Sequence, residues 1–358
     1  MKMMERGPMK KATLAMFIVG LFPFVNLAGA QEESETVDQV TLSLTTHHPG
    51  NIPRSFPARL IKEEIEKATD GNVTIDINYA EALARGREAL TSVQYGIADI
   101  GDVNPAYYPG QLPLHAGIMV YTQAPPTHAQ KREVMERAYE AYSVLPEEFE
   151  QYNQRVLFQY QPQPLALSST DPVSNINDFK GLKIRASSEV YLRMLESLGA
   201  TPISVPFTDS YMALQTGTID AVYTNIDALS GQNMFEPAPY TFTSPELSLF
   251  LPFTFTINQD VWDSFSGETQ ENITAAMEVA HERYAEAYDD EYQRQIDLFK
   301  ENGEELVFAS DEDVETWQSL PIIEELKADL AETAEAEGVA DGGKFVSDIE
   351  RFMVEAVQ

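Results

Sequence analysis

The sequence predicts an α/β protein built from two similar halves. Three observations support this fold class. Short segments with the apolar period of a strand alternate with segments of helical period along much of the chain. The spacing Gln-x-Gly-x-x-Asp occurs once in each half, at residues 94–99 and 215–220. From Glu268 onward, a single helical pattern continues for about eight turns without Gly or Pro.

The first half alternates between predicted strands and helices. Val40, Leu42 and Leu44 alternate with polar residues, which is the period of a half-buried strand. The helix that follows ends at Asp70 and Gly71. Because strands that alternate with helices usually pair in parallel, we expect a largely parallel sheet. The predicted strands are 40–44, 73–77, 97–100 and 156–158, and the predicted helices are 56–68, 87–94 and 134–145.

Pro162 and Pro164 interrupt this pattern, and a second α/β half follows. Residues 250–257 resemble a strand that returns to the first half, and the long helical pattern comes next. The other predicted strands are 182–184 and 219–223, and the other predicted helices are 190–198, 211–216 and a final helix at 314–335.

The repeated Gln-x-Gly-x-x-Asp spacing makes the two halves alike. In each copy the glycine can adopt a positive φ and end a helix, and a buried strand follows at once. We expect each aspartate to lie inside that strand, toward the ligand-facing edge of its sheet. Two such halves leave a cleft between them. The predicted first lobe comprises residues 31–162 with about 252–285, and the second comprises 163–251 with about 286–358.

Residues 1–30 are predicted to be a secretory signal. Four basic residues precede an apolar stretch at 12–25, and small residues before Gln31 favour cleavage near Ala30. The apolar stretch is short and is broken by Gly20 and Pro23, which disfavours the alternative of a membrane anchor. We therefore expect an exported, periplasmic protein.

The composition excludes several classes of function. A formal net charge of −33 repels phosphate, so neither a nucleic acid nor an anionic membrane surface is an expected partner. The chain has no cysteine, and its five histidines form no HxxxH or HExxH pair, so thiol chemistry and common zinc sites are excluded. Phosphate-binding loops and a GxSxG elbow are also missing, which leaves a secreted hydrolase or isomerase as a remote alternative. No catalytic residue and no cofactor is predicted.

Two features carry candidate binding chemistry. His47 and His48 are adjacent, and in an extended chain their side chains would point to opposite faces. We therefore expect one of them to line the cleft and expect no metal site. Arg185 stands at the end of the strand at 182–184 in a chain poor in arginine. Its planar guanidinium suits bidentate capture of a ligand carboxylate, but an internal salt bridge is an equal alternative.

Several segments closely resemble the DctP-type substrate-binding proteins of TRAP transporters. They are DFKGLKIRA at 178–186, LGATP at 198–202, VPFTDSYMALQTGTID at 205–220, LARGREAL at 83–90 and QYGIAD at 94–99. The resemblance implies a periplasmic receptor with two α/β lobes, a type II-like binding-protein fold and a long helix that spans both lobes. It also implies that the protein binds an organic acid by hinge closure and delivers it to the integral membrane subunits of a sodium-driven transporter.

The resemblance also implies roles for particular residues. Arg185 would pair with the ligand carboxylate, and Phe207 would pack on the ligand. The strand after the glycine motif of the second half would add polar contacts through Tyr223, Thr224 and Asn225. Loops of the first lobe would contribute as well, and the residues expected there are His47, His48, Asp102, Asn104 and Tyr107.

The sequence departs from the family pattern in ways that bear on the ligand. Many members carry a second arginine where this chain has QYQPQPL at 159–165, and the common DGxEN is DAVYTN at 220–225. A monocarboxylate, and one with an aromatic ring, therefore fits better than a dicarboxylate. The alternatives are a neutral or cationic solute that faces Asp102 or Asp227, and a receptor that serves an ABC transporter or a sensor kinase.

Overall fold

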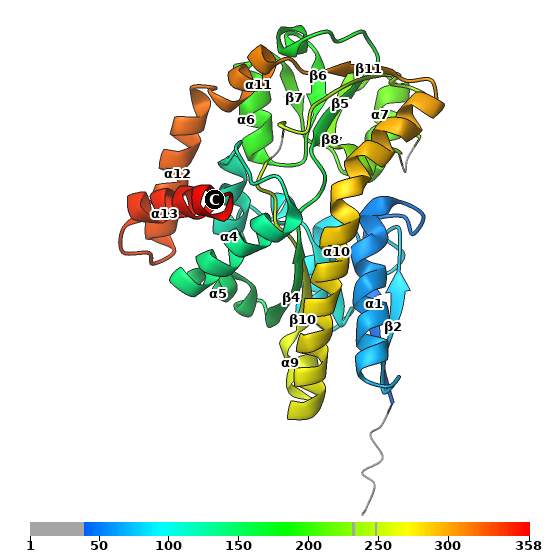
Figure 1. The fold of residues 1–358 in the computed structure, drawn as a ribbon, viewed down its shortest axis with the longest axis vertical. Helices are drawn as coiled ribbons and strands as arrows, with labels where there is room; N and C mark the ends of the chain where they lie inside the picture. The colour runs from blue at the N-terminus through cyan, green and yellow to red at the C-terminus, as the bar shows by residue number, and fades with distance from the viewer. Residues whose placement is uncertain (1–38, 231–232, 248) are drawn as a thin grey trace, which may run out of the picture. The chain divides into compact units, whose positions relative to one another are not determined.

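Two mixed β-sheets with helices packed around them make up the computed structural model (Figure 1). The structure describes residues 39–230, 233–247 and 249–358, and residues from Asp38 to Gln358 form one compact unit. The predicted signal segment and its cleavage near Ala30 lie outside the described residues. Among the described helices, none combines the length and the apolar character needed to cross a bilayer.

The first sheet has the strand order β2-β1-β3-β10-β4. β1 pairs in parallel with β2 and β3, as expected for strands joined by helices, but β10 is antiparallel to both β3 and β4. The expectation of a largely parallel sheet is therefore wrong for this side, because the chain enters β10 on its return from the second sheet. The strands are β1 (Val40–Thr45), β2 (Val73–Asn78), β3 (Ile100–Val103), β4 (Gln154–Tyr160) and β10 (Phe253–Asn258).

Helices cover the first sheet through their apolar faces, and α1 is an example. In α1, Leu60, Ile61 and Ile65 are fully buried and belong to the main core with Leu44 and Ile257 from the sheet. The helices of this part are α1 (Phe56–Ala68), α2 (Ala89–Gln94), α3 (Pro113–Gly117), α4 (His128–Ala141) and α5 (Val144–Glu150). Short 3₁₀ turns accompany them: η1 (Pro53–Ser55), η2 (Gly86–Glu88), η3 (Pro105–Tyr107) and η4 (Ile118–Val120).

The second sheet has the order β11-β9-β5-β8-β6-β7. β6 is parallel to β7 and β8, whereas β5 is antiparallel to β8 and β9. The strands are β5 (Leu165–Ser169), β6 (Lys183–Arg185), β7 (Thr201–Ile203), β8 (Ala221–Asn225), β9 (Tyr240–Thr243) and β11 (Glu305–Phe308). The helical segments are η5 (Ile176–Phe179), α6 (Glu189–Ser197), η6 (Phe207–Asp209), α7 (Ser210–Gln215) and α8 (Ile226–Leu229).

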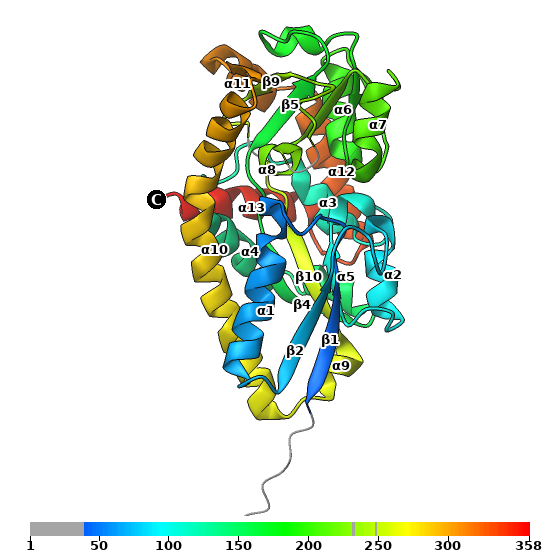
Figure 2. The same cartoon turned by 90° about the vertical axis from the view of Figure 1, so that its right-hand side faces the viewer.

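One long helix serves both sheets. α10 (Gly267–Glu301) has 35 residues, and it follows the short α9 (Gln259–Asp263). The hydroxyl of Ser266 caps its first turn by accepting from the backbone N–H of Thr269 at 3.1 Å. α10 contacts α1 and α4 beside the first sheet, and α8 and β11 beside the second. Figure 2 shows α10 running along the molecule past both sheets. The expectation of a long helix that spans both halves is confirmed.

The end of the chain differs from the prediction of one final helix. It forms α11 (Asp311–Gln318), α12 (Ile322–Ala336) and α13 (Gly342–Ala356), with the first break before Pro321. α13 packs on α4, and the hydroxyl of Tyr142 donates to Asp348 Oδ2 at 2.7 Å. Since α4 lies beside the first sheet, the last helix contacts residues outside the lobe to which it was assigned. The lobe boundaries stay a prediction.

The repeated motif recurs in the structure, but its aspartates do not face the ligand edge. Gly96 and Gly217 have φ of +67° and +70°, as expected. The strands then begin later than expected, after the aspartates. Asp99 Oδ2 accepts from the backbone N–H of Ser43 at 2.7 Å, and Asp220 Oδ2 accepts from that of Lys183 at 2.8 Å. Both aspartates therefore stand before the N-terminal ends of their strands and tie each strand to its neighbour, so the earlier placement is wrong.

Candidate ligand site

Strand ends from both sheets converge on the candidate site. β1 of the first sheet ends two residues before His47, and β3 carries Asp102. In the second sheet, β6 ends at Arg185 and β8 ends at Asn225. Apart from Tyr107 and Thr224, which are half-buried, the predicted site residues are at most 7 % exposed. The two sides therefore lie against each other in this conformation.

Arg185 has no acidic partner in the described part of the chain. It is 1 % exposed, its Nε donates to the carbonyl of Val205 at 3.0 Å, and its Nη2 has no hydrogen-bond partner there. Its Cζ lies 5.5 Å from the centre of the Phe207 ring. Burial lowers the pKa of Arg185, and the nearby Tyr107 opposes that shift. Of the two roles that the sequence left open, the internal salt bridge is therefore not observed among these residues.

His47 and His48 lie side by side, which contradicts the expectation that they point to opposite faces. β1 ends at Thr45, so both follow the strand in a bend rather than in extended chain. Their ring centres are 3.8 Å apart, and the side chains are only 4 % and 3 % exposed. The alternation rule holds only within a strand, and here the strand has already ended.

The carboxylate of Asp102 lies beside the two histidine rings. The ligating atoms of the three residues all lie within 4.8 Å of one another, and His48 Nε2 is 3.9 Å from Asp102 Oδ2. Thr46 Oγ1 donates to Asp102 Oδ2 at 2.7 Å. Burial raises the pKa of Asp102 to about 6, although this hydrogen bond and Arg54 oppose the shift.

The same surroundings hold both imidazoles neutral. Burial, followed by the charges of Arg54 and Arg185, lowers the pKa of His47 to about 3. The pKa of His48 is lowered by burial, then by His47 and Arg54. At neutral pH each ring therefore has one nitrogen that donates and one that accepts.

The other first-lobe residues of the prediction differ in their surroundings. Asn104 is buried, and its Oδ1 accepts from the backbone N–H of Ala106 at 3.0 Å, which caps the turn η3. Tyr107 stacks edge-on against His47 with ring centres 5.8 Å apart. The guanidinium of Arg87 also packs on the Tyr107 ring, with its Cζ 4.8 Å from the ring centre. Tyr107 thus lies between the histidines and Arg185, whereas Asn104 has at least a structural role.

The predicted residues of β8 are not equivalent. Tyr223 packs edge-on against Trp317 and Tyr191, with ring centres 5.4 Å and 6.2 Å apart, and its buried hydroxyl has no partner among the described atoms. Asn225 donates from Nδ2 to the carbonyl of Gln163 at 2.7 Å and so holds the segment between the sheets. Thr224 is half-buried, and no hydrogen bond of its side chain is recorded in the described structure.

Sequence reasoning missed an ion pair at the centre of the site. Arg54 donates from Nε to Asp227 Oδ2 at 2.9 Å and from Nη2 to Oδ1 at 2.7 Å, and both residues are 3 % exposed. Although burial alone would lower the pKa of Arg54, Asp227 raises it above its usual value. Arg54 follows the first sheet and Asp227 follows the second, so the pair joins the two sides. No local sequence signal links residues that are 173 positions apart.

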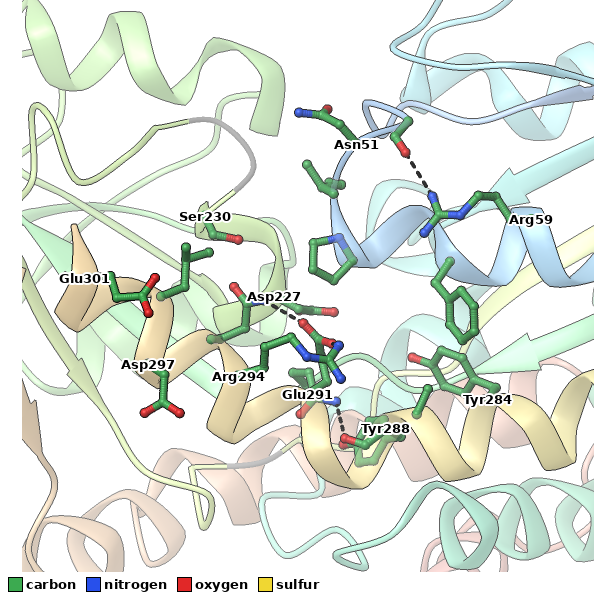
Figure 3. Close-up of a pocket in the computed structure, with 18 of the residues that line it drawn as sticks. Asn51, Arg59, Asp227, Ser230, Tyr284, Tyr288, Glu291, Arg294, Asp297 and Glu301 are labelled. Atoms are coloured by element: carbon green, nitrogen blue, oxygen red, sulfur yellow. Dashed lines mark hydrogen bonds and ion pairs between the residues drawn. The ribbon is translucent and has the colours of Figure 1, made fainter.

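A cavity of about 730 Å³ lies beside this pair, next to α10 (Figure 3). Its walls include Asn51 and Arg59 near α1, and Tyr284, Tyr288 and Glu291 on α10. Asp227 also lines it. None of the predicted site residues does, so this cavity is distinct from the cluster around Arg185.

The family model for bacterial extracellular solute-binding proteins of family 7, also called DctP, matches residues 46–328 of this chain. The chain belongs to this family. It is therefore a TRAP-type extracytoplasmic solute receptor from a family of periplasmic binding proteins that are not enzymes, which confirms the family and the class of function expected from the sequence.

Individual relatives agree with this assignment. The 2,3-diketo-L-gulonate-binding periplasmic protein YiaO of Escherichia coli is 31 % identical over 39 % of this chain, although the match spans only 42 % of YiaO. The ectoine-binding periplasmic protein TeaA of Halomonas elongata is 23 % identical over 74 % of each chain. A solved TRAP periplasmic solute binding protein from Desulfovibrio salexigens is 28 % identical, with a TM-score of 0.70, over 88 % of this chain and 96 % of that one.

One further solved structure supports the fold alone. A marine metagenome TRAP solute binding protein specific for aromatic acid ligands is 19 % identical, with a TM-score of 0.79, over 90 % of this chain and 100 % of that one. The two-sheet architecture with a long helix is therefore that of the family.

Proposed function

We propose that this receptor binds a small organic monocarboxylate, that Arg185 pairs with the carboxylate, and that the protein hands the ligand to the membrane subunits of a TRAP transporter. One observation supports the proposal most strongly. Arg185 is 1 % exposed, yet its Nη2 has no partner among the described atoms. A buried guanidinium without an anion is costly, and a ligand carboxylate would supply that anion.

The surroundings of Arg185 suit one carboxylate rather than two. Arg54, the other buried guanidinium of the site, already pairs with both oxygens of Asp227. Phe207 and Tyr107 lie next to Arg185 and offer apolar surface and ring edges to the ligand. This arrangement favours a monocarboxylate with an apolar or aromatic body.

Binding is proposed to occur by hinge closure. In the closed conformation the Arg54–Asp227 pair joins the side of the first sheet to that of the second. A ligand held by Arg185 on one side and by His47 and His48 on the other would contact both sides only after closure. It would therefore bind the closed form more tightly and shift the population toward it.

The ligands named for similar proteins are consistent with this proposal but differ among themselves. One solved relative is specific for aromatic acid ligands, and another, from Bordetella pertussis, binds pyroglutamic acid. TeaA is named as an ectoine-binding protein. The chemistry of the acid must therefore follow from the side chains in the site of this chain.

Export is proposed to remove the N-terminal segment near Ala30. Intact-mass measurement of the protein from the periplasm should give a chain that starts at Gln31. A mass that retains residues 1–30 would show that this segment is an anchor.

The proposal is tested with purified protein and a panel of organic acids. A thermal-shift screen identifies acids that raise the midpoint of unfolding, and calorimetry then measures their affinity. Arg185→Ala should weaken binding of the best acid by at least thirtyfold, because the buried carboxylate loses its partner. Arg193→Ala, which removes an arginine paired with Asp329 on the surface, is the matched control and should bind as the wild type does.

Two outcomes would contradict the role of Arg185. Unchanged affinity in Arg185→Ala would show that the carboxylate binds elsewhere. A large fall in the melting temperature of the empty protein, together with unchanged affinity, would show that Arg185 only stabilises the fold.

A further inference from the structure

Polar atoms without partners gather opposite Arg185. Among the described atoms, His47 Nδ1 and both ring nitrogens of His48 are buried and make no hydrogen bond. The two rings lie beside the carboxylate of Asp102, and one ligating atom from each of the three residues lies within 4.8 Å of the other two. Buried polar atoms are rarely left unpaired in folded proteins, so this cluster indicates a partner that arrives with the ligand.

The hydrogen-bonding capacity of the cluster defines that partner. A neutral imidazole donates from one nitrogen and accepts at the other, and both nitrogens of His48 are free in the described structure. Asp102 accepts from Thr46 at 2.7 Å, and its second oxygen has only a 3.5 Å contact with the hydroxyl of Tyr160. The cluster therefore offers both acceptors and a donor. A hydroxyl or a ring amide complements it, because each of these groups donates and accepts.

The charges around the cluster disfavour charged groups of either sign. A second carboxylate would lie against Asp102 and two neutral rings. An ammonium group would be attracted by Asp102 but would lie in the field of Arg54 and Arg185, the same charges that lower the pKa of His47. The Arg54 charge is compensated by Asp227, and a single ligand carboxylate would compensate that of Arg185.

From these contacts we infer that the ligand is a monocarboxylic acid whose opposite end carries a hydroxyl or a ring N–H/C=O group, held by His47, His48 and Asp102. This inference rests on the proposed function and adds the second recognition group to it. Arg185 selects an acid, and the cluster selects among acids.

The same three side chains also resemble a metal-ligand set, which makes metal-mediated binding the main rival. Neutral imidazoles and a carboxylate are ordinary ligands of divalent transition metals. However, a dication would add to the positive field of two neighbouring guanidiniums. The hydrogen-bonding role avoids that cost, and the test distinguishes the two roles.

The first measurement compares acids that differ only in the opposite group. The pairs are 3-hydroxybenzoate with benzoate, 3-hydroxypropionate with propionate, and pyroglutamate with cyclopentanecarboxylate, and calorimetry measures each affinity. In every pair that binds, the member with the hydroxyl or ring amide should bind at least tenfold tighter, because its absence leaves buried groups unpaired. Equal affinities within those pairs, or equal binding of isophthalate and 3-hydroxybenzoate, would overturn the inference while the role of Arg185 stands. If no monocarboxylate binds, the proposed function fails and the inference fails with it.

The second measurement uses variants of the cluster. His48→Phe keeps a ring of similar size but removes both nitrogens, so it should remove the tenfold preference for the acid that carries the hydroxyl or ring amide. His281→Phe replaces a buried histidine that stacks on Phe158 away from the cluster, and it should keep the preference. Retained preference in His48→Phe would overturn the inference.

A third measurement separates hydrogen bonding from metal binding. After dialysis against EDTA, the affinity for the preferred acid should be unchanged, and added ZnCl₂ or MnCl₂ should not raise it. Loss of affinity in EDTA that is restored by either metal would overturn the hydrogen-bonding role and identify the three residues as metal ligands.

Discussion

At the scale of single residues, the site depends on close packing as much as on charge. Gly86 is an example, because a methyl group added there would lie 3.0 Å from the ring of His47 and 3.3 Å from that of Tyr107. The glycine therefore allows both rings to approach the chain closely. Glycine is needed at this position because a side chain would not fit, and not because the backbone has a positive φ.

Gly86→Ala should weaken ligand binding several-fold while it changes the free energy of unfolding by no more than about 1–2 kcal/mol. The physical reason is that the added methyl displaces His47 and Tyr107 from the ligand. Gly110→Ala is the control, because nothing lies within 4 Å of a methyl group there. Calorimetry and urea unfolding of both variants check this prediction, and equal affinities for the two variants would contradict it.

Sequence reasoning found some of these residues and missed others for physical reasons. Arg185 was found because a cation at the end of a buried strand is unusual. Arg54 was missed because its importance comes from Asp227, which is distant in sequence. The pairing of His47 with His48 was misjudged because the strand ends at Thr45, before the histidines.

At the scale of elements, the Arg54–Asp227 pair connects η1 to α8 and so links the two sides of the site. Asp227→Asn keeps the shape of the side chain but leaves the Arg54 charge buried and unpaired. Breaking such a pair typically costs about 3–5 kcal/mol. Because that cost falls on the closed form, the variant should favour the open form.

Small-angle scattering should therefore give a larger radius of gyration for ligand-free Asp227→Asn than for wild type, and calorimetry should give weaker ligand binding. Arg132→Gln, which breaks a more exposed pair with Glu278, is the control and should leave both quantities unchanged. An unchanged radius and affinity in Asp227→Asn would show that the pair does not control closure.

Elements themselves were predicted unevenly. The long helix α10 was predicted from its period alone, because no Gly or Pro interrupts it. The strands after Gly96 and Gly217 were placed too early, because the residues that follow each glycine first turn into the sheet and the aspartate then bonds to the neighbouring strand. The predicted final helix ends at residue 335, close to the end of α12 at Ala336, but the helical period of residues 342–356 was not recognised as a further helix.

At the scale of the whole molecule, buried histidines make the folded state sensitive to acid. Burial, followed by Arg132 and His128, lowers the pKa of His281 to about 2, compared with 6.5 in the unfolded chain. Below pH 6.5 the unfolded state therefore binds a proton on His281 that the folded state does not. The contribution of neutral His281 to the free energy of unfolding is fully present above pH 6.5 and is lost as the pH falls toward 2.

His281→Phe should abolish the uptake of the proton that His281 binds when the wild type unfolds. Between pH 6 and pH 4.5, the free energy of unfolding of the wild type should fall more steeply than that of the variant, by about 1.4 kcal/mol per pH unit. Urea unfolding at several pH values measures the two slopes. Parallel slopes would show that His281 does not titrate on unfolding.

The whole fold was more predictable than the site. Alternating strand and helix periods and the repeated glycine motif indicated two α/β halves. β5 was not predicted, and β10 was predicted as a strand but not as an antiparallel one, because strand direction depends on which sheet the chain enters. The site depends on contacts between residues of different sheets, and periodicity carries no information about those contacts.

The central claim is that the guanidinium of Arg185 binds the carboxylate of the ligand. A crystal structure with the tightest acid from the screen tests it most directly. We expect a ligand carboxylate oxygen within hydrogen-bonding distance of Arg185 Nη2. An Arg185 that is paired with a side-chain carboxylate, with the acid bound by other residues, would contradict the account.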